Sequence, residues 1–284
     1  MKIHVLNTGF FKLDGGAMFG VVPKSLWSKT NPADPNNMCS WALRCMLIEQ
    51  GDRLILIDTG MGEKQSEKFF SYYYLHGEDA LDKNLKALGF SRDDITDVFL
   101  THLHFDHCGG AVEWNGQKNG YRPTFKNAIY WSTKTHWDWA INPNDREKAS
   151  FLKENIMPLQ ESGQLQFVER NGALTKNVFE NFDVLFVDGH TESMMIPQIK
   201  YQDKTLVFMA DLLPSVGHIP LPYVMGYDTK PLTTLKEKGE FLIKAQKEDY
   251  ILFLEHDSIN ECCTLMETEK GIRLDRSFDF KEMF

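Results

Sequence analysis

Residues 101–110 read Thr-His-Leu-His-Phe-Asp-His-Cys-Gly-Gly, and this stretch decides the fold. Three of the chain's nine histidines fall within six positions here, directly after an apolar run that predicts a strand. Imidazole nitrogens and carboxylate oxygens are ligands for zinc and neighbouring transition metals. His102 and His104 can point toward one ion, and Asp106 and His107 then turn toward a second. The stretch therefore predicts a metal site at the end of a strand.

Three further ligand-type residues stand at the ends of apolar runs downstream. His190 ends the segment Leu-Phe-Val-Asp-Gly-His, Asp211 ends Leu-Val-Phe-Met-Ala-Asp, and His256 ends Ile-Leu-Phe-Leu-Glu-His. Taken alone, each is more typical of a surface or helix-capping residue. Together they indicate several strand ends that converge on one site.

The rest of the chain alternates between strand and helix patterns. Apolar runs at 42–49 and 53–58, separated by Gln-Gly-Asp, predict a hairpin of buried strands. Leucines at 81, 85 and 88 share one helical face, and Gly89 stands where a C-terminal cap is expected. The remaining predicted elements are a strand over the first six residues, strands at 95–101, 165–170, 183–188, 194–200, 205–210 and 250–254, and an amphipathic helix at 231–247. This order favours a layered α/β fold.

Composition limits the classes of protein that fit. With 284 residues, 42% hydrophobic and 25% charged, and no repeat or long linker, the chain is expected to be a single domain over 1–284. No apolar run reaches 18 residues, which predicts no membrane span. A net charge of −9 argues against nucleic acid as the main partner. Five cysteines without a CxxC pair, and a first segment without the features of a signal peptide, predict a cytoplasmic location.

The motif HxHxDH at 102–107, the three downstream residues and Leu-Ile-Asp-Thr-Gly at 56–60 together resemble the metallo-β-lactamase-fold metallo-hydrolase superfamily. The resemblance runs from residue 53 to 257 and implies a four-layer αββα sandwich with a two-metal site at one edge of its sheets. Carried over residue by residue, it implies that His102, His104 and His190 hold one metal, that Asp106, His107 and His256 hold the other, and that Asp211 bridges them. Asp58 becomes an acceptor that orients a ligating histidine, or else simply a turn-forming residue.

The resemblance also implies a chemistry. Two cations hold a bridging hydroxide that attacks a carbonyl or phosphoryl centre, and Asp106 orients that hydroxide as well as binding metal. No nucleophilic triad is evident in the sequence. Ligands without a thiolate leave zinc, manganese, iron and cobalt open, with zinc as the default.

Single positions separate the branches of the superfamily. Asp211 stands where the best-known β-lactamases have cysteine, and His104 stands where flavo-di-iron reductases have glutamate. Glyoxalase II has a shorter gap than the 83 residues from His107 to His190. The stretches 13–20 and 211–228 instead resemble the branch of N-acyl-homoserine lactonases and methyl-parathion-hydrolase-like enzymes. A lactone or ester substrate follows from that resemblance, with another ester, a phosphotriester or a thioester (arylesterase-like or glyoxalase II-like) as alternatives. A protein that binds metal or ligand without turnover also stays open.

One departure from the lactonase pattern affects the catalytic residues. Some lactonases carry a catalytic tyrosine three residues after the bridging aspartate, and Pro214 occupies that position here. A replacement has to come from elsewhere, and Tyr227 or His218 are our candidates beside Asp106, with Tyr223 a further one. Aromatic residues between 114 and 139, together with Phe19 and Trp27, either pack in the core, form a wall or loop over the metal site, or contribute to a homodimer surface.

Overall fold

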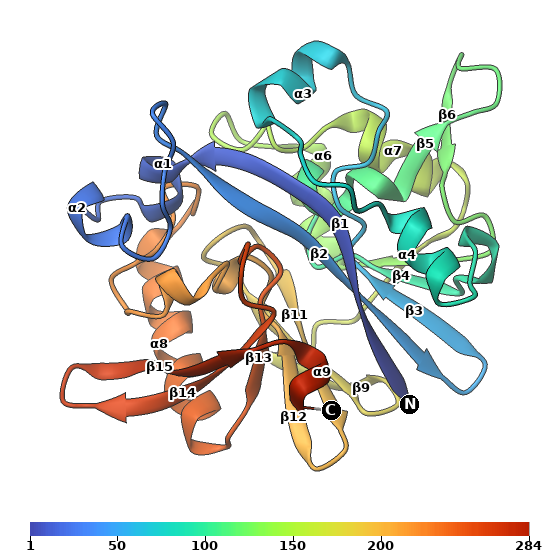
Figure 1. Ribbon diagram of the computed structural model, residues 1–284. Coiled ribbons are helices and arrows are strands. Elements are labelled where there is room, and N and C mark those ends of the chain that lie inside the picture. The colour runs from blue at the N-terminus through green and yellow to red at the C-terminus, as the bar shows by residue number, and fades with distance from the viewer. Residues whose placement is uncertain (284) are drawn as a thin grey trace. The chain divides into compact units, whose positions relative to one another are not determined.

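The computed structural model describes residues 1–283 and divides into two compact units. Unit 1 comprises Met1–Gly9 and Leu43–Arg170, and unit 2 comprises Phe10–Ala42 and Asn171–Phe284. Each unit contains one large β-sheet (Figure 1). Strands β1 and β2 both run through a boundary between the units.

The sheet of unit 1 has the order β1-β2-β3-β4-β7-β8. Its strands are β1 (Lys2–Asp14), β2 (Met38–Gln50), β3 (Arg53–Ile57), β4 (Asp97–Phe99), β7 (Ile129–Ser132) and β8 (Leu165–Phe167). β2 and β3 form the predicted antiparallel hairpin, whereas β3, β4, β7 and β8 pair in parallel. Because parallel strands end at one edge, the segments that follow β3, β4 and β7 start side by side.

Helices and a small hairpin complete unit 1. The helices are α3 (Glu67–Tyr73), α4 (Leu81–Ala87), α5 (Phe105–Cys108), α6 (Lys134–Ile141) and α7 (Lys153–Glu161), with short 3-10 turns at Arg92–Asp94 and Gly109–Ala111. β5 (Val112–Trp114) pairs with β6 (Tyr121–Pro123). Leu85 of α4 and Trp137 of α6 are buried in the same hydrophobic cluster as Leu56 and Val98 of the sheet.

The sheet of unit 2 has the order β15-β14-β13-β12-β11-β10-β9. Its strands are β9 (Leu174–Phe179), β10 (Phe182–Val187), β11 (Met194–Tyr201), β12 (Lys204–Phe208), β13 (Ile251–Phe253), β14 (Cys262–Thr268) and β15 (Gly271–Phe278), the last two drawn as the red hairpin in Figure 1. β10 and β12 are each antiparallel to β11, and β12 is parallel to β13. β10, β12 and β13 therefore run in one direction and end at the same edge of the sheet.

The helices of unit 2 are α1 (Gly15–Phe19), α2 (Lys24–Trp27), α8 (Pro231–Lys247) and α9 (Phe280–Met283), and 3-10 turns lie at Ala210–Leu212 and Val216–His218. α8 has the predicted bounds and packs against β14 and β15. It begins with Pro231 at its N-terminus, where a missing N–H breaks no hydrogen bond.

The predicted α/β class is confirmed, and the two sheets with their helices are those that an αββα fold requires. The sequence patterns did not reveal β9, β14, β15, α6 or α7.

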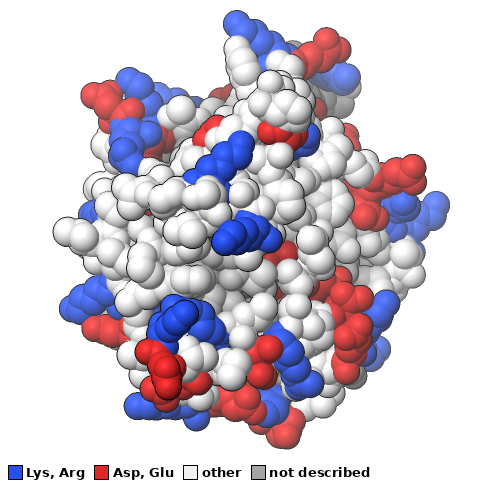
Figure 2. Space-filling view, turned by 60° about the vertical axis from the view of Figure 1, so that its left-hand side comes forward, with Lys and Arg blue, Asp and Glu red and all other residues white. Residues whose placement is uncertain are grey.

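No helix within residues 1–283 is both long and apolar enough to cross a bilayer. On the face drawn in Figure 2, acidic and basic side chains are intermingled along the rim, and a few basic side chains lie among uncharged residues near the middle. The single domain over 1–284 stays a prediction.

Candidate metal centre

His102 and His104 lie in unit 1, in the segment that follows β4. Both side chains are buried, and Nε2 of His102 lies 3.1 Å from Nδ1 of His104. The hydrogen-bond partners of the other two ring nitrogens decide whether these facing atoms carry hydrogens.

The His102 tautomer follows from Asp58. Its carboxylate accepts hydrogen bonds from the Thr101 backbone N–H (2.8 Å) and from the Thr101 hydroxyl (2.6 Å). Since the hydroxyl hydrogen is used there, Oγ1 of Thr101 accepts from Nδ1 of His102, 3.1 Å away. A neutral imidazole carries one hydrogen, so Nε2 of His102 is unprotonated.

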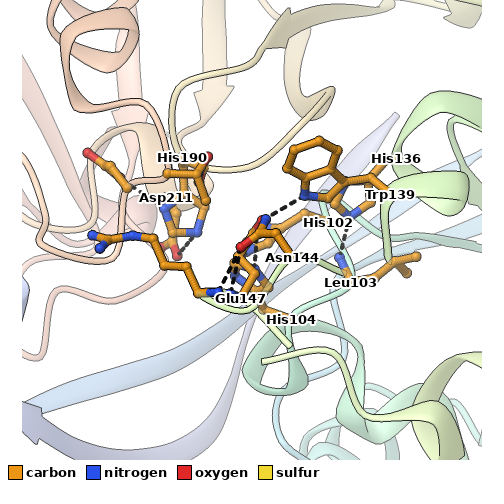
Figure 3. Close-up of polar contacts among 12 residues, drawn as sticks. His102, Leu103, His104, His136, Trp139, Asn144, Glu147, His190 and Asp211 are labelled. Carbon is orange, nitrogen blue, oxygen red and sulfur yellow. Dashed lines mark hydrogen bonds and ion pairs between the residues drawn. The ribbon is translucent and has the colours of Figure 1, made fainter. Parts of the chain in front are cut away.

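The His104 tautomer follows from Glu147. Nε2 of His104 lies 3.2 Å from the Glu147 carboxylate and donates its hydrogen there (Figure 3). Nδ1 of His104 is therefore unprotonated as well. Two lone pairs face each other at 3.1 Å, and two such nitrogens repel unless a cation lies between them.

Asp106 and His107 occupy the short helix α5 directly after this pair. Nδ1 of His107 donates to Asp58 across 3.1 Å, and its Nε2, which is unprotonated in the neutral ring, lies 3.7 Å from the Asp106 carboxylate. Both side chains are buried. Asp58 thus holds the ring of His107, and the role of His107 as a metal ligand stays a prediction.

Backbone contacts fix the segment that carries these ligands. The Leu103 N–H donates to Nε2 of His136 (2.9 Å), and Thr59 donates to the His107 carbonyl through both its N–H and its hydroxyl. The buried ammonium of Lys64 donates to the Gly109 carbonyl, and burial lowers the pKa of Lys64 to about 8.

His190 and Asp211 lie in unit 2, in the segments that follow β10 and β12. Nε2 of His190 is 3.0 Å from one Asp211 oxygen, and Nδ1 is 3.0 Å from Asp228. Burial lowers the pKa of His190, but Asp211 and Asp228 outweigh it and raise that pKa to about 10. Two carboxylates on opposite sides of one ring thus favour positive charge at this position.

His256 follows β13 and completes the group in unit 2. Its Nδ1 donates to the Ala42 carbonyl (2.8 Å), so its Nε2 is unprotonated and faces the second Asp211 oxygen at 3.1 Å. The Asp211 carboxylate therefore lies between two imidazoles, with one oxygen toward each. This is the arrangement expected of a carboxylate that bridges two cations.

His218 is held inside unit 2. It is 1% exposed, its Nε2 donates to the Met18 carbonyl (2.9 Å), and its Nδ1 accepts from the Ser215 hydroxyl (2.8 Å). The ring stacks on Phe19 with centroids 4.3 Å apart, and Phe19 stacks in turn on Trp27. Burial lowers the pKa of His218 to about 3, so the ring is neutral.

These contacts bear on two interpretations from the sequence. Phe19 and Trp27 are buried, as expected of residues that pack in the core. The contacts of His218 are those of a residue that fixes the backbone, and its catalytic role stays a prediction. Tyr227 is 38% exposed and is the more accessible of the two catalytic candidates. Tyr223 packs edge-on against Phe19 at 6.4 Å.

Sequence reasoning missed several residues that the structure places around the ligands. Glu147 comes from a polar turn with no motif, 43 residues after His104. Asp228 lies within the stretch that resembles lactonases, so that resemblance could have identified it as a residue near the predicted metal site. Lys238 is buried in α8 and donates to the carbonyls of His218, Pro220 and Tyr223. Burial lowers the pKa of Lys238 to about 7.

Comparisons with known proteins identify relatives and solved structures that this chain resembles. The N-acyl homoserine lactonase AiiA of Bacillus thuringiensis subsp. kurstaki is 26% identical over 254 residues, which cover 84% of this chain and 88% of AiiA. A crystal structure of a probable metal-dependent hydrolase from Staphylococcus aureus has a TM-score of 0.87 and 29% identity, covering 98% of this chain and 96% of that one. AidC, a dizinc quorum-quenching lactonase solved with a product, has a TM-score of 0.79 at 24% identity, covering 98% and 95% of the two chains, and shares the fold.

The family comparison covers every ligand position described above. The model of the metallo-beta-lactamase superfamily matches residues 44–256, from within β2 to His256. The chain therefore belongs to the metallo-β-lactamase superfamily and is an enzyme of the metal-dependent hydrolase class.

Proposed function

We propose that the chain hydrolyses a lactone or ester, such as an acyl-homoserine lactone, with two divalent metal ions. In this proposal His102, His104 and His190 bind one ion, Asp106, His107 and His256 bind the other, and Asp211 bridges them. The family supports this use of the ligands, because its model extends over all seven positions. Zinc is the proposed metal, with manganese, iron or cobalt as alternatives.

The observation that carries the proposal is the hydrogen-bonding pattern of four predicted ligand histidines. His102, His104, His107 and His256 each have one ring nitrogen within hydrogen-bond distance of a protein acceptor, so that in its neutral form each ring keeps the other nitrogen unprotonated. A metal requires this form of imidazole. The donor set contains only nitrogen and oxygen, which fits zinc and the other divalent ions named above.

The protein's own side chains have distinct tasks in this mechanism. When bound, two divalent ions supply Lewis acidity and lower the pKa of water to near neutrality. Asp106 accepts a hydrogen bond from the attacking water and so orients it toward the carbonyl carbon. Asp58, Asp228 and Glu147 hold the imidazole rings in place, so that little reorganisation accompanies the reaction.

The substrate class in the proposal rests on relatives. AiiA and other homologues named N-acyl homoserine lactonase match the chain over most of its length. We assign a contact with the substrate to the Tyr227 hydroxyl, since Pro214 removes the usual tyrosine and Tyr227 is accessible. His218 is proposed to act through Met18 and Ser215, whose positions it fixes. A homodimer, a cytoplasmic location and the lack of a nucleic-acid partner stay predictions.

Metal content and a substrate panel test the proposal together. We would measure metals per chain by mass spectrometry and assay acyl-homoserine lactones, simple lactones, aryl esters, a phosphotriester, a glutathione thioester and nitrocefin, each with and without a chelator. Two metals and chelator-sensitive lactone cleavage are expected. Two metals with cleavage of only an ester, phosphotriester or thioester would replace the substrate and keep the mechanism. One metal or none, without turnover, would leave a binding protein and refute the proposal.

A further inference from the structure

Glu147 is a buried carboxylate that lies outside every motif in the sequence. It is 3% exposed, although it belongs to a polar turn whose neighbour Asp145 has a side chain that is 97% exposed. A buried carboxylate is costly unless donors surround it. Its contacts therefore indicate why the fold retains it.

Three side-chain donors converge on Glu147 (Figure 3). One oxygen accepts from Nε2 of His104 at 3.2 Å, and the other accepts from the Trp139 indole at 2.6 Å and the Asn144 amide at 2.8 Å. Trp139 lies in α6 and Asn144 in the following turn, so the polypeptide on both sides of Glu147 holds the carboxylate in place. The position of the carboxylate is thus set by donors other than the histidine.

Glutamine has a similar shape to glutamate but cannot accept all three of these hydrogen bonds. Glutamine presents one oxygen and one NH₂ group. With its oxygen toward His104, its NH₂ would face two donors, the indole and the amide. With the amide turned over, its NH₂ would face Nε2 of His104 and force the hydrogen of that ring onto Nδ1. Only a carboxylate satisfies all three donors at once.

We propose that Glu147 is a positioning residue that makes His104 a metal ligand through Nδ1. The carboxylate fixes the ring hydrogen on Nε2, holds the orientation of the ring, and increases the basicity of the nitrogen that faces His102. The other ligand histidines whose tautomers are set above, His102, His107 and His256, keep Nε2 unprotonated, so His104 is the exception among them. This inference rests on the proposed metal centre. It adds Glu147 to the residues that determine the affinity for the ion that His102 and His104 hold.

The test combines Zn²⁺ affinity with NMR of the histidine rings. We would titrate the wild type, E147Q, W139F and D145N with Zn²⁺ against a chelator, and record ¹⁵N spectra of ¹⁵N-histidine-labelled protein. The zinc-loaded wild type is expected to show one histidine bound through Nδ1 with its Nε2–H retained. In E147Q that signature should disappear, and one of the two Zn²⁺ affinities should fall by about 10- to 100-fold.

Two variants separate this role from a general effect on folding. W139F removes one donor and keeps the carboxylate, so it should retain the Nδ1-bound histidine with a smaller loss of affinity. D145N makes the same charge change two residues away at an exposed site and should match the wild type. Thermal unfolding of each variant reports whether it folds, and W139F carries the test if E147Q does not.

The remaining outcomes would overturn the inference. If E147Q keeps the Nδ1 signature and both Zn²⁺ affinities, Glu147 has no such role while the metal centre stands. Equal weakening of both affinities would refute the link to His104. A wild type that binds no Zn²⁺ would refute the proposed function itself, and a wild type that binds Zn²⁺ only through Nε2 nitrogens would refute this inference alone.

Discussion

Four of the predicted ligand histidines each have an acceptor for the ring hydrogen, and the acceptors differ in kind. His102 uses a threonine hydroxyl, His104 and His107 use carboxylates, and His256 uses the Ala42 carbonyl. A charged acceptor increases the basicity of the imidazole more than a neutral one does. At the scale of single residues, the basicity of these imidazoles is therefore set by groups that are not themselves predicted ligands.

His218 allows a prediction at this scale. H218A should lower the free energy of unfolding by about 2–4 kcal/mol, because the Met18 carbonyl and Ser215 lose their partner and a buried ring is removed. Turnover should fall while metal content stays at the wild-type value. Chemical denaturation, kcat and metal analysis measure the three effects.

Y227F serves as the comparison, since it removes one hydroxyl from a partly exposed side chain and should leave stability unchanged. If H218A loses stability but keeps the wild-type kcat, His218 has no part in positioning the site.

At the scale of elements, the segment after β3 and the segment after α5 touch through their backbones. A Cβ on Gly109 would lie 2.1 Å from the Met61 carbonyl oxygen, and one on Gly110 would lie 2.2 Å from that of Thr59. Gly109 has a helical φ of −59°, so close approach rather than an unusual backbone angle requires glycine here. This contact holds the His107 segment against the segment that carries Asp58.

G110A is therefore expected to destabilise the protein by about 1–3 kcal/mol and to weaken metal binding, because the two segments must move apart. Thermal unfolding and Zn²⁺ titration give both quantities. G116A is the matched control, since a Cβ there meets nothing within 4 Å. Wild-type stability and affinity in G110A would show that the segments can separate without cost.

At the scale of the whole molecule, the family match over residues 44–256 includes all seven predicted ligand positions. The predicted ligands are buried carboxylates and imidazoles, and buried carboxylates are costly to keep in the interior without a cation. Bound metal is thus expected to contribute to folding as well as to catalysis.

Removal of metal should therefore destabilise the protein. For one site, free Zn²⁺ at 1,000 times its Kd adds about 4 kcal/mol to the free energy of unfolding, and a chelator removes that amount. Denaturant unfolding with and without chelator, followed by Zn²⁺ addition, measures the loss and its recovery. An unfolding curve that does not respond to the chelator would contradict a metal bound to the folded state.

The sequence by itself determined the α/β class and the family, and it predicted the ligand residues. The spacing of the predicted ligands in 102–107 is local, and His190, Asp211 and His256 each follow an apolar strand. Both the spacing and the position after a strand can therefore be recognised in the sequence alone. The paired strands at 42–58 and the helix at 231–247 were predictable for the same reason, since their periodicity is a property of neighbouring residues.

Only the tertiary structure decided which residues support the ligands. Glu147 reaches His104 across 43 residues and Asp228 reaches His190 across 38, and no periodicity encodes such a contact. His218 is a second example, because the sequence does not show that its ring contacts the Met18 carbonyl, 200 residues away. Hydrogen-bond partners distant in the chain fix tautomers and burial, and they exist only once the chain has folded.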